Sequence, residues 1–400
     1  MNEFVIFEGG ITAPEGFKAG GIHCGIKRKS LDLAIVYTVK RAFAAAVVTS
    51  NLVKAAPIGL CKSHLKNPVI QAIVVNSGNA NCCTGKEGEV WARKMAFRTA
   101  EEMGVEMENV LVCSTGTIGK PLPIELIEDG IKALKGKISE KGGHDAAEAI
   151  LTTDLRTKEI AVRFSTSDGR TVTIGGMAKG SGMIDPSMAT MLAFLSTDAV
   201  CSPAYIEECL KEAVAESFNC ITVDGDKSTN DMVVLLANGD DQSHRIEPGS
   251  EDDKLFRKGL NFVCEDLARK IAADGEGASK LVEIHVTGAA NIDDAKKAAH
   301  SVANSNLLKV ALHGCSPNWG RIMAALGASG VSQLYPEKID IFMNGMMVAK
   351  NGQAGPANED EARNKLDVKE IRIDIDLKIG EGYSRFYTCD LTKGYIDINL

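Results

Sequence analysis

The segment Gly175-Gly-Met-Ala-Lys-Gly-Ser-Gly-Met-Ile-Asp-Pro-Ser-Met-Ala-Thr-Met-Leu-Ala-Phe-Leu195 lies near the middle of the 400-residue chain. Its four glycines and its proline disfavour regular structure as far as Ser187. The sequence becomes apolar at Met191, directly after the hydroxyl residue Thr190. We therefore expect a loop that leads into a buried strand or helix from Met191 onward.

Thr190 has two interpretations at this boundary. In the first, it is the entry residue or N-cap of the buried element. In the second, it is a nucleophile whose hydroxyl proton passes to its own α-amine. That amine is free only if the bond between Ala189 and Thr190 is cut, and the small side chain of Ala189 suits a tight self-cleavage site. Lys179 would supply positive charge nearby. The residues alone leave both interpretations open.

The composition is that of a globular protein, with 44% hydrophobic and 24% charged residues. The length allows two or three domains. The net charge of −8 argues against a nucleic-acid-binding protein. No apolar run approaches the roughly 20 residues that cross a bilayer, and the first residues lack the basic and apolar regions of a signal peptide. We therefore expect a cytoplasmic protein.

The chain offers no recognisable site for a metal or a nucleotide. Its eleven cysteines are odd in number and show no Cys-x-x-Cys spacing, which favours free thiols. The seven histidines have no metal-binding spacing. The run that begins at Asp224 resembles a calcium loop, but Thr229 and Leu235 stand where such a loop needs glycine and glutamate. We therefore expect no metal and no cofactor.

Strand and helix patterns alternate along the chain, which predicts an α/β or α+β fold. A main domain is predicted over 1–287 and a smaller α/β domain over 288–400. Short strands are predicted at Ile221–Val223 and Leu307–Leu312, and a last pair of short strands after the period-two strand Ile371–Leu377.

Two further positions have a plain and a functional interpretation. Ser114-Thr-Gly-Thr-Ile-Gly119 follows a predicted strand and is either a simple turn or an oxyanion site, in which a glycine N–H lies beside a threonine hydroxyl. Glu276, between two glycines, is either a solvated loop acid or a group that holds a substrate ammonium.

A set of motifs distributed over nearly the whole chain resembles one known family. The motifs are Gly9-Gly-Ile-Thr-Ala-Pro-Glu-Gly-Phe-Lys-Ala-Gly-Gly21, Val53-Lys-Ala-Ala-Pro57, Val75-Asn-Ser-Gly-Asn-Ala-Asn81, Ser114-Thr-Gly-Thr-Ile-Gly119, Thr152-Thr-Asp154, Gly176-Met-Ala-Lys-Gly-Ser-Gly-Met-Ile184, Met188-Ala-Thr-Met-Leu-Ala-Phe194, Thr222-Val-Asp-Gly225, Ser228-Thr-Asn-Asp231, Gly275-Glu-Gly-Ala-Ser-Lys280 and Pro317-Asn-Trp-Gly-Arg-Ile322. In this order they resemble the ornithine acetyltransferases, which are the glutamate N-acetyltransferases of arginine biosynthesis.

The resemblance implies a precursor that cuts itself between Ala189 and Thr190. The two pieces, 1–189 and 190–400, would stay together and pair as α2β2. It implies an αββα sandwich similar to the self-processing aminopeptidases, with a smaller C-terminal domain. The implied reaction moves an acetyl group from N2-acetylornithine to glutamate through an acetyl-Thr190 intermediate. Some members also accept acetyl-CoA, and the sequence leaves that point open.

The resemblance also assigns roles to single residues. Thr190 would be the nucleophile, and the Thr115 hydroxyl with the Gly116 N–H would form the oxyanion hole. The residues assigned to substrate contacts are Thr153, Lys179, Thr190, Glu276 and Asn399. We expect Lys179 to hold a substrate carboxylate and Glu276 the ornithine ammonium.

The chain departs from the family pattern at three places. The family usually has alanine where Asp185 stands and asparagine where Ser187 stands. Members also tend to continue past the asparagine that matches Asn399 to a hydroxyl residue, whereas this sequence ends at Leu400. Two alternatives to acetyl transfer follow from the residues: an aminopeptidase or amidase with the same nucleophile, and an unprocessed small-molecule-binding protein in which Thr190 is buried.

Overall fold

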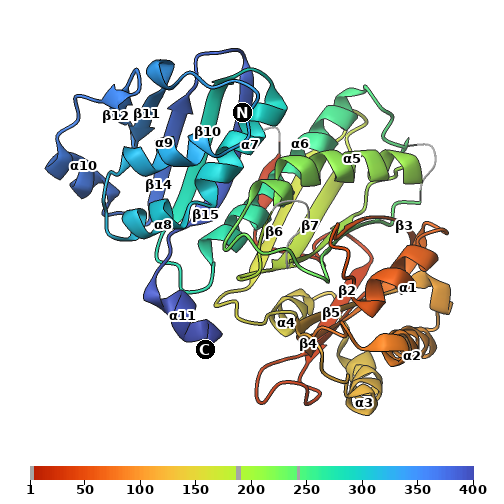
Figure 1. Cartoon of the computed structure of the whole chain (residues 1–400). Helices are drawn as coiled ribbons and strands as arrows, with labels where there is room; N and C mark the ends of the chain where they lie inside the picture. The colour runs from red at the N-terminus through yellow and green to blue at the C-terminus, as the bar shows by residue number, and fades with distance from the viewer. Residues whose placement is uncertain (1–3, 186–190, 241–243) are drawn as a thin grey trace. The chain divides into compact units, whose positions relative to one another are not determined.

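The computed structural model describes residues 4–185, 191–240 and 244–400, and these form two compact units (Figure 1). Unit 1 comprises 1–180, 187–219 and 227–267, and unit 2 comprises 181–186, 220–226 and 268–400. The predicted cleavage site between Ala189 and Thr190 and the predicted nucleophile Thr190 therefore lie outside the described residues.

Unit 1 is built on one sheet of nine strands with helices against it. The strands are β1 (Val5–Phe7), β2 (Phe17–Ile22), β3 (Leu33–Val48), β4 (Val69–Asn79), β5 (Val110–Thr117), β6 (Lys158–Ser165), β7 (Thr171–Lys179), β8 (Leu192–Thr197) and β9 (Met232–Ala237). The helices are α1 (Ala56–His64), α2 (Gly85–Met103), α3 (Ile124–Leu134), α4 (Gly143–Ala149), α5 (Pro203–Glu216) and α6 (Glu251–Ala273), the last of which ends in unit 2.

The long strand β3 joins two halves of this sheet. Its first part pairs with β2 and β4, its last part pairs with β9, and its register with β4 shifts between Tyr37 and Ala42. Side chains from both halves meet in one buried cluster, which includes Ile73 of β4, Phe194 of β8 and Val234 of β9. The two halves therefore enclose a common core, as the predicted sandwich requires.

Helices cover the outer face of each sheet half. Val74 and Val112 point away from the shared core and pack with residues of α2 and α3, such as Met95 and Ile131. On the other half, a side chain at Gly176 would meet Leu195 of β8 and the α6 residues Val263 and Leu267. Figure 1 shows α5 and α6 along β6 and β7. The mixed α/β class predicted from the sequence is confirmed.

Two glycines of the central segment lie inside a strand, where we expected a loop. Gly175 and Gly176 belong to β7, which pairs on both sides with β6 and β8. A Cβ at Gly175 would lie 2.1 Å from the carbonyl oxygen of Gly10, so only glycine fits there. The glycine run therefore reflects close backbone packing at its start.

Unit 2 has a second sheet, in the order β13-β12-β11-β14-β10-β15, with helices packed on it. Its strands are β10 (Leu281–Ala289), β11 (Asp340–Met343), β12 (Met346–Lys350), β13 (Gln353–Ala354), β14 (Glu370–Asp376) and β15 (Gly382–Cys389). Its helices are α7 (Ile292–Ala303), α8 (Asn306–His313), α9 (Trp319–Gly327), α10 (Glu359–Leu366) and α11 (Lys393–Asn399). The core alternates along β14 through Ile371, Ile373 and Ile375, as the period-two pattern predicts.

Three predictions of local structure were wrong. Leu307–Leu312 lies in helix α8 rather than in a strand, and the Ser305 hydroxyl caps that helix by accepting a bond from Leu308 N–H. Ile221–Val223 forms no strand, since only Ile221 makes an isolated bridge, to Tyr387. The predicted last pair of strands is the strand β15 followed by helix α11.

The division between the units differs from the domain boundary predicted at 287/288. It falls between Leu267 and Ala268, inside α6. Strand β10 pairs with β14 and β15 in the second sheet, so residues before 288 are already part of that unit. Two short segments, 181–186 and 220–226, also belong to unit 2.

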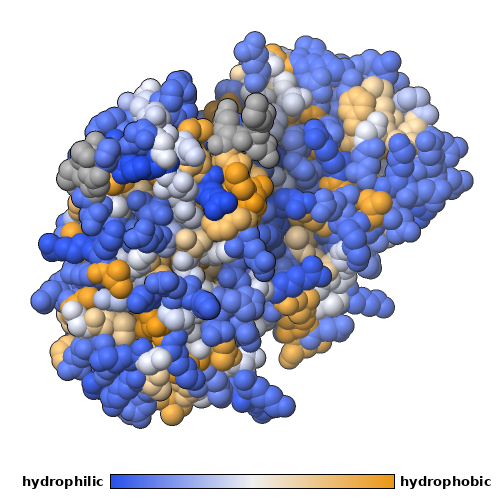
Figure 2. All heavy atoms as spheres, turned by 180° about the vertical axis from the view of Figure 1, so that it is seen from behind, coloured by the Kyte–Doolittle hydropathy of each residue, from blue (hydrophilic) through white to orange (hydrophobic). Residues whose placement is uncertain are grey.

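In the part of the chain that the structure describes, no helix has the length and apolarity needed to cross a membrane. On the face in Figure 2, hydrophilic side chains predominate and hydrophobic ones occur in scattered groups. Scattered apolar side chains of this kind are common on protein surfaces.

Replacing Phe194 with alanine should destabilise unit 1 by about 3–5 kcal/mol, because a fully buried ring is lost from the core shared by the two sheet halves. Chemical denaturation followed by circular dichroism measures the loss. Phe97 on α2 is 51% exposed, so Phe97→Ala is the matched control, with an expected change within about 0.5 kcal/mol. Equal losses in the two variants would contradict the core assignment.

Candidate active site

A carboxylate fixes the residue that follows Thr190 in the chain. The backbone N–H of Met191 donates a hydrogen bond of 2.9 Å to Oδ1 of Asp231. Met191 precedes β8 and Asp231 precedes β9, and these strands run parallel with Leu192 opposite Met232. Parallel pairing therefore brings the start of both strands to the same edge of the sheet.

Asp231 is an unusual acid because it is completely buried. Its exposed fraction is 0%, and Oδ2 has no hydrogen-bond partner among the residues described. Burial raises the pKa of Asp231 to about 8, although the bond from Met191 N–H acts in the opposite direction. The side chain is therefore mostly protonated at pH 7.

Asn230 connects this edge to the segment predicted to be an oxyanion site. Its side-chain amide donates to the carbonyl of Ser114 and to the carbonyl of Ala80, both at 2.7 Å. Ser114 directly precedes Thr115 at the end of β5. Adjacent residues, Asn230 and Asp231, thus bond to the backbone next to Thr115 and to the backbone next to Thr190.

Thr115 and Gly116 lie near the end of β5 beside β4, opposite Ser77 and Gly78. Thr115 is buried and Gly116 is exposed. Gly116 has a φ of +130°, and a Cβ there would lie 2.4 Å from the carbonyl carbon of Gly78. Only glycine fits at this position, which keeps the backbone next to Thr115 uncovered by a side chain.

Lys179 ends β7 opposite Leu192 of β8, and its ammonium is held by two groups. It donates to the Thr152 hydroxyl at 2.8 Å and lies 3.7 Å from the Asp154 carboxylate. Lys158 also pairs with Asp154, at 2.7 Å. Burial alone would raise the pKa of Asp154, but the two ammonium groups and a bond from Gly180 N–H hold it well below its usual range. Asp154 therefore positions a charged Lys179.

Unit 2 brings together two other residues that the resemblance assigned to substrate. Oε2 of Glu276 accepts a hydrogen bond of 2.7 Å from the side-chain amide of Asn399, which lies at the end of α11. The N–H of Glu276 donates to the carbonyl of Ser181 at 2.9 Å. A Cβ at Gly182 would lie 2.4 Å from the Glu276 carboxyl carbon, so the glycine leaves room for that group.

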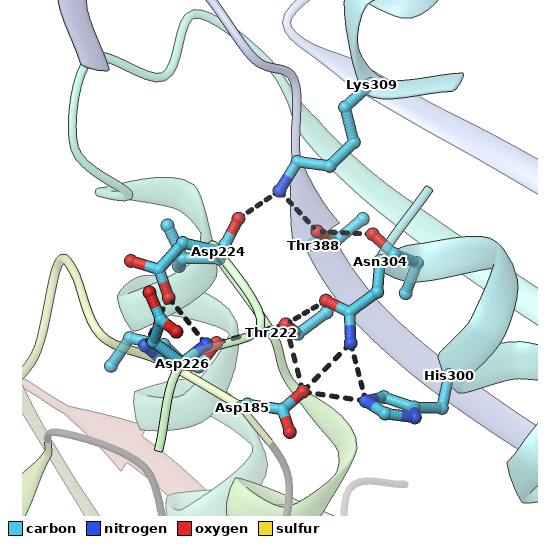
Figure 3. A network of polar contacts seen from close by, with 11 residues as sticks. Asp185, Thr222, Asp224, Asp226, His300, Asn304, Lys309 and Thr388 are labelled. Atoms are coloured by element: carbon cyan, nitrogen blue, oxygen red, sulfur yellow. Dashed lines mark hydrogen bonds and ion pairs between the residues drawn. The ribbon is translucent and has the colours of Figure 1, made fainter. Parts of the chain in front are cut away.

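Asp185, where the resemblance led us to expect alanine, belongs to a polar network within unit 2 (Figure 3). Its Oδ1 lies 2.7 Å from His300 Nε2 and accepts a bond of 2.9 Å from the Asn304 amide. The Thr222 hydroxyl lies 3.5 Å from the same oxygen. Asp185 is buried, whereas His300 is partly exposed. The partners of the acid therefore come from helix α7 and its C-cap residue Asn304.

The structure thus places the predicted residues in two groups. Thr115, Gly116 and Lys179 belong to unit 1, where Thr153 is exposed in the loop after α4. Glu276 and Asn399 belong to unit 2.

Sequence reasoning missed the residues that hold the predicted ones in place, which are Thr152, Asp154, Asn230 and Asp231. These residues belong to two of the motifs quoted above, 152–154 and 228–231, and each motif sets polar residues next to an apolar strand. That contrast is the signal that could have indicated buried polar contacts. In the described part of the chain, no three His, Cys, Asp or Glu side chains are grouped to hold a metal.

Comparison with known proteins gives a consistent result. A family model described as the ArgJ family matches residues 18–400. A protein of Caldanaerobacter subterraneus subsp. tengcongensis named "Arginine biosynthesis bifunctional protein ArgJ" is 45% identical, over 98% of each chain. A protein of Symbiobacterium thermophilum with the same name is 47% identical, again over 98% of each chain.

A solved structure, ornithine acetyltransferase complexed with ornithine from Mycobacterium tuberculosis, is 37% identical with a TM-score of 0.43. The match covers 46% of this chain and 98% of that one.

Replacing Asp231 with asparagine should make stability less dependent on pH. The folded acid, with a pKa of about 8, keeps its proton while the unfolded acid, near 3.8, loses it. The parent therefore loses stability as pH rises from about 4 to about 8, by up to about 1.4 kcal/mol per unit. The asparagine keeps an acceptor for Met191 N–H and cannot ionise. Denaturation at several pH values, with Thr190→Ala present in both proteins so that neither chain is cut, measures the difference. Parallel pH profiles would contradict this prediction.

Proposed function

The chain belongs to the ArgJ family, and from that premise we propose that it transfers the acetyl group of N2-acetylornithine to glutamate in arginine biosynthesis. The products are ornithine and N-acetylglutamate. The match covers 98% of each relative's own length, so the proposal concerns the complete acetyl-transfer reaction.

The proposed cycle uses Thr190 as an N-terminal nucleophile. Its α-amine takes the hydroxyl proton while the oxygen attacks the acetyl carbonyl. The Thr115 hydroxyl and Gly116 N–H donate to the oxyanion that forms. Ornithine leaves with the proton, and acetyl-Thr190 remains. The amine of glutamate then attacks that ester, and N-acetylglutamate leaves. The cycle requires no cofactor.

One structural observation carries this proposal. Asp231 bonds the backbone of Met191, and its neighbour Asn230 bonds the carbonyl that precedes Thr115. Lys179 lies on the strand that pairs with β8. Asn230 and Asp231 therefore connect β5 in one half of the sheet to the start of β8 in the other half. This contact brings the proposed oxyanion donors toward the residue next to Thr190 and the ammonium of Lys179, as an acyl-transfer site requires.

The substrate contacts are proposed residue by residue. The ammonium of Lys179 is fixed by Thr152 and Asp154, which suits recognition of a substrate carboxylate. Glu276, a carboxylate held by Asn399, suits the ornithine side-chain ammonium. Thr153 and Asn399 complete the contacts that we propose.

The nucleophile needs a free α-amine, so we also propose self-cleavage between Ala189 and Thr190. The pieces 1–189 and 190–400 would remain associated, because β7 in the first piece pairs along its length with β8 in the second. Two such pairs would form an α2β2 assembly.

Intact mass under denaturing conditions tests the cleavage. The purified chain should give two pieces that match 1–189 and 190–400, while Thr190→Ala should give one species of 42.6 kDa. Acetyl transfer from N2-acetylornithine to glutamate should be absent in that variant. A single uncut species with full activity would overturn the N-terminal nucleophile.

The same assay separates the alternative activities. Acetate released without an acceptor would indicate an amidase, and ligand binding by an uncut chain without turnover would indicate a binding protein. Because the relatives are named bifunctional, acetyl-CoA is tested as a second donor.

Replacing Glu276 with glutamine should reduce kcat/KM for N2-acetylornithine roughly 10–100-fold, because a charged hydrogen bond to the ammonium is lost. The variant keeps an oxygen that accepts from Asn399, so the local contact is retained. Turnover of a neutral acetyl ester is the control and should change little. Equal losses of kcat/KM on the two substrates would contradict the assignment of Glu276 to the ornithine ammonium.

A further inference from the structure

A lysine and a cysteine of unit 2 lie unusually close together. Nζ of Lys280, just before β10, is 2.9 Å from Sγ of Cys315, which directly follows Gly314 at the end of α8. The same Nζ donates to the carbonyl of Leu366 at 2.6 Å. Lys280 is only 8% exposed, whereas Cys315 is partly exposed.

In the part of the chain that the structure describes, no carboxylate pairs with the buried ammonium of Lys280. Among the described residues, none lies within 4.0 Å of its nitrogen, so the sulfur of Cys315 is the group nearby that can take a negative charge. A buried charge is costly unless it is paired, and the contacts of this ammonium are the sulfur of Cys315 and the carbonyl of Leu366. Oδ1 of Asp367 also lies near the sulfur, at the longer distance of 3.9 Å.

Small solutes can reach this pair. It lines a cavity of about 320 Å³, together with Ser279, His313, Asp367, Val368 and Lys369. The cavity is open to small polar molecules, and hydrogen peroxide is only slightly larger than water. Cys315 therefore combines access with an adjacent cation, which are the two conditions for a reactive thiol.

The other cysteines provide an internal contrast. Eight of them are buried, and the remaining two are Cys24 and Cys83. Cys24 lies beside the carboxylate of Asp32, and burial together with that charge raises the pKa of its thiol to about 12. Cys83 is exposed, and its sulfur lies 3.8 Å from that of Cys82. Among the residues that the structure describes, no lysine amine lies at the sulfur of Cys24 or of Cys83.

We propose that Lys280 and Cys315 form an oxidative modification site, at which hydrogen peroxide joins Sγ of Cys315 to Nζ of Lys280. The site is separate from the proposed acetyl transfer and needs no substrate. Both residues lie in 190–400, so cleavage at 189/190 leaves the pair in one piece.

The chemistry has two steps. In the first, the thiolate attacks one oxygen of peroxide and the O–O bond breaks. The Lys280 ammonium protonates the leaving hydroxide, which gives a sulfenic acid, water and the neutral amine. Sulfur loses two electrons and peroxide gains them. In the second, the amine attacks the sulfenic sulfur, the S–O bond breaks, and hydroxide leaves with a proton from nitrogen as a second water. The product has an S–N bond and two hydrogen atoms fewer than the reduced chain.

The test treats the full-length protein with hydrogen peroxide, blocks free thiols with iodoacetamide and maps peptides by mass spectrometry. We expect a peptide pair that links residue 280 to residue 315, is lighter by two hydrogen atoms, and separates on reduction with dithiothreitol. Cys315 should react about tenfold or more faster than Cys83. A Cys82–Cys83 disulfide has the same mass change but maps to a different peptide.

Two variants of Lys280 separate the steps. Lys280→Arg keeps a cation at the sulfur but has no nucleophilic amine, so dimedone should trap the sulfenic acid and no link should form. Lys280→Met should slow the formation of sulfenic acid as well, and Cys83→Ser should leave the link unchanged. Two results in the treated wild type would overturn the proposal. One is a Cys315 that is blocked by iodoacetamide and therefore not oxidised, and the other is a sulfinic acid at Cys315 with no link to Lys280.

Discussion

Aspartate side chains accept hydrogen bonds from the backbone amides on both sides of 186–190, and the central segment depends on these bonds. They run from Gly180 to Asp154 at 2.6 Å, from Met183 and Ile184 to Asp224 at 2.6 and 2.9 Å, and from Met191 to Asp231 at 2.9 Å. A segment that leaves a β-ladder must find other acceptors for its buried N–H groups. Ionised or protonated carboxyl oxygens from distant parts of the chain supply them here.

The same acids also set the electrostatics of the candidate site. Asp154 lies between two lysine ammonium groups, which lower its pKa, whereas burial raises the pKa of Asp231 to about 8 although the charge of Lys179 acts in the opposite direction. Two buried aspartates at one sheet edge therefore hold opposite protonation states at neutral pH. One fixes the charge of Lys179, and the other is a neutral acid next to Met191.

The sequence indicated elements with a strong local pattern, such as the alternation over Ile371–Leu377 and the hairpin between β6 and β7. It failed at Leu307–Leu312, because a short apolar run fits a helix as well as a strand and the N-cap Ser305 was overlooked. For the site, the motifs named Thr115, Gly116, Lys179 and Glu276. The bonds of Asn230 to Ser114 and Ala80 span more than 100 residues, and no local pattern encodes such contacts.

Asp185 shows how a departure from a family pattern is accommodated. A carboxylate in place of alanine, four residues before the predicted cut, would be costly if it were buried without partners. His300 and Asn304 lie one turn apart on α7, so both reach the same oxygen of Asp185. Thr222, whose hydroxyl also bonds Ile184, approaches from a different segment. Because its carboxylate is hydrogen-bonded inside unit 2, Asp185 can anchor the backbone that precedes 186–190 rather than disrupt it.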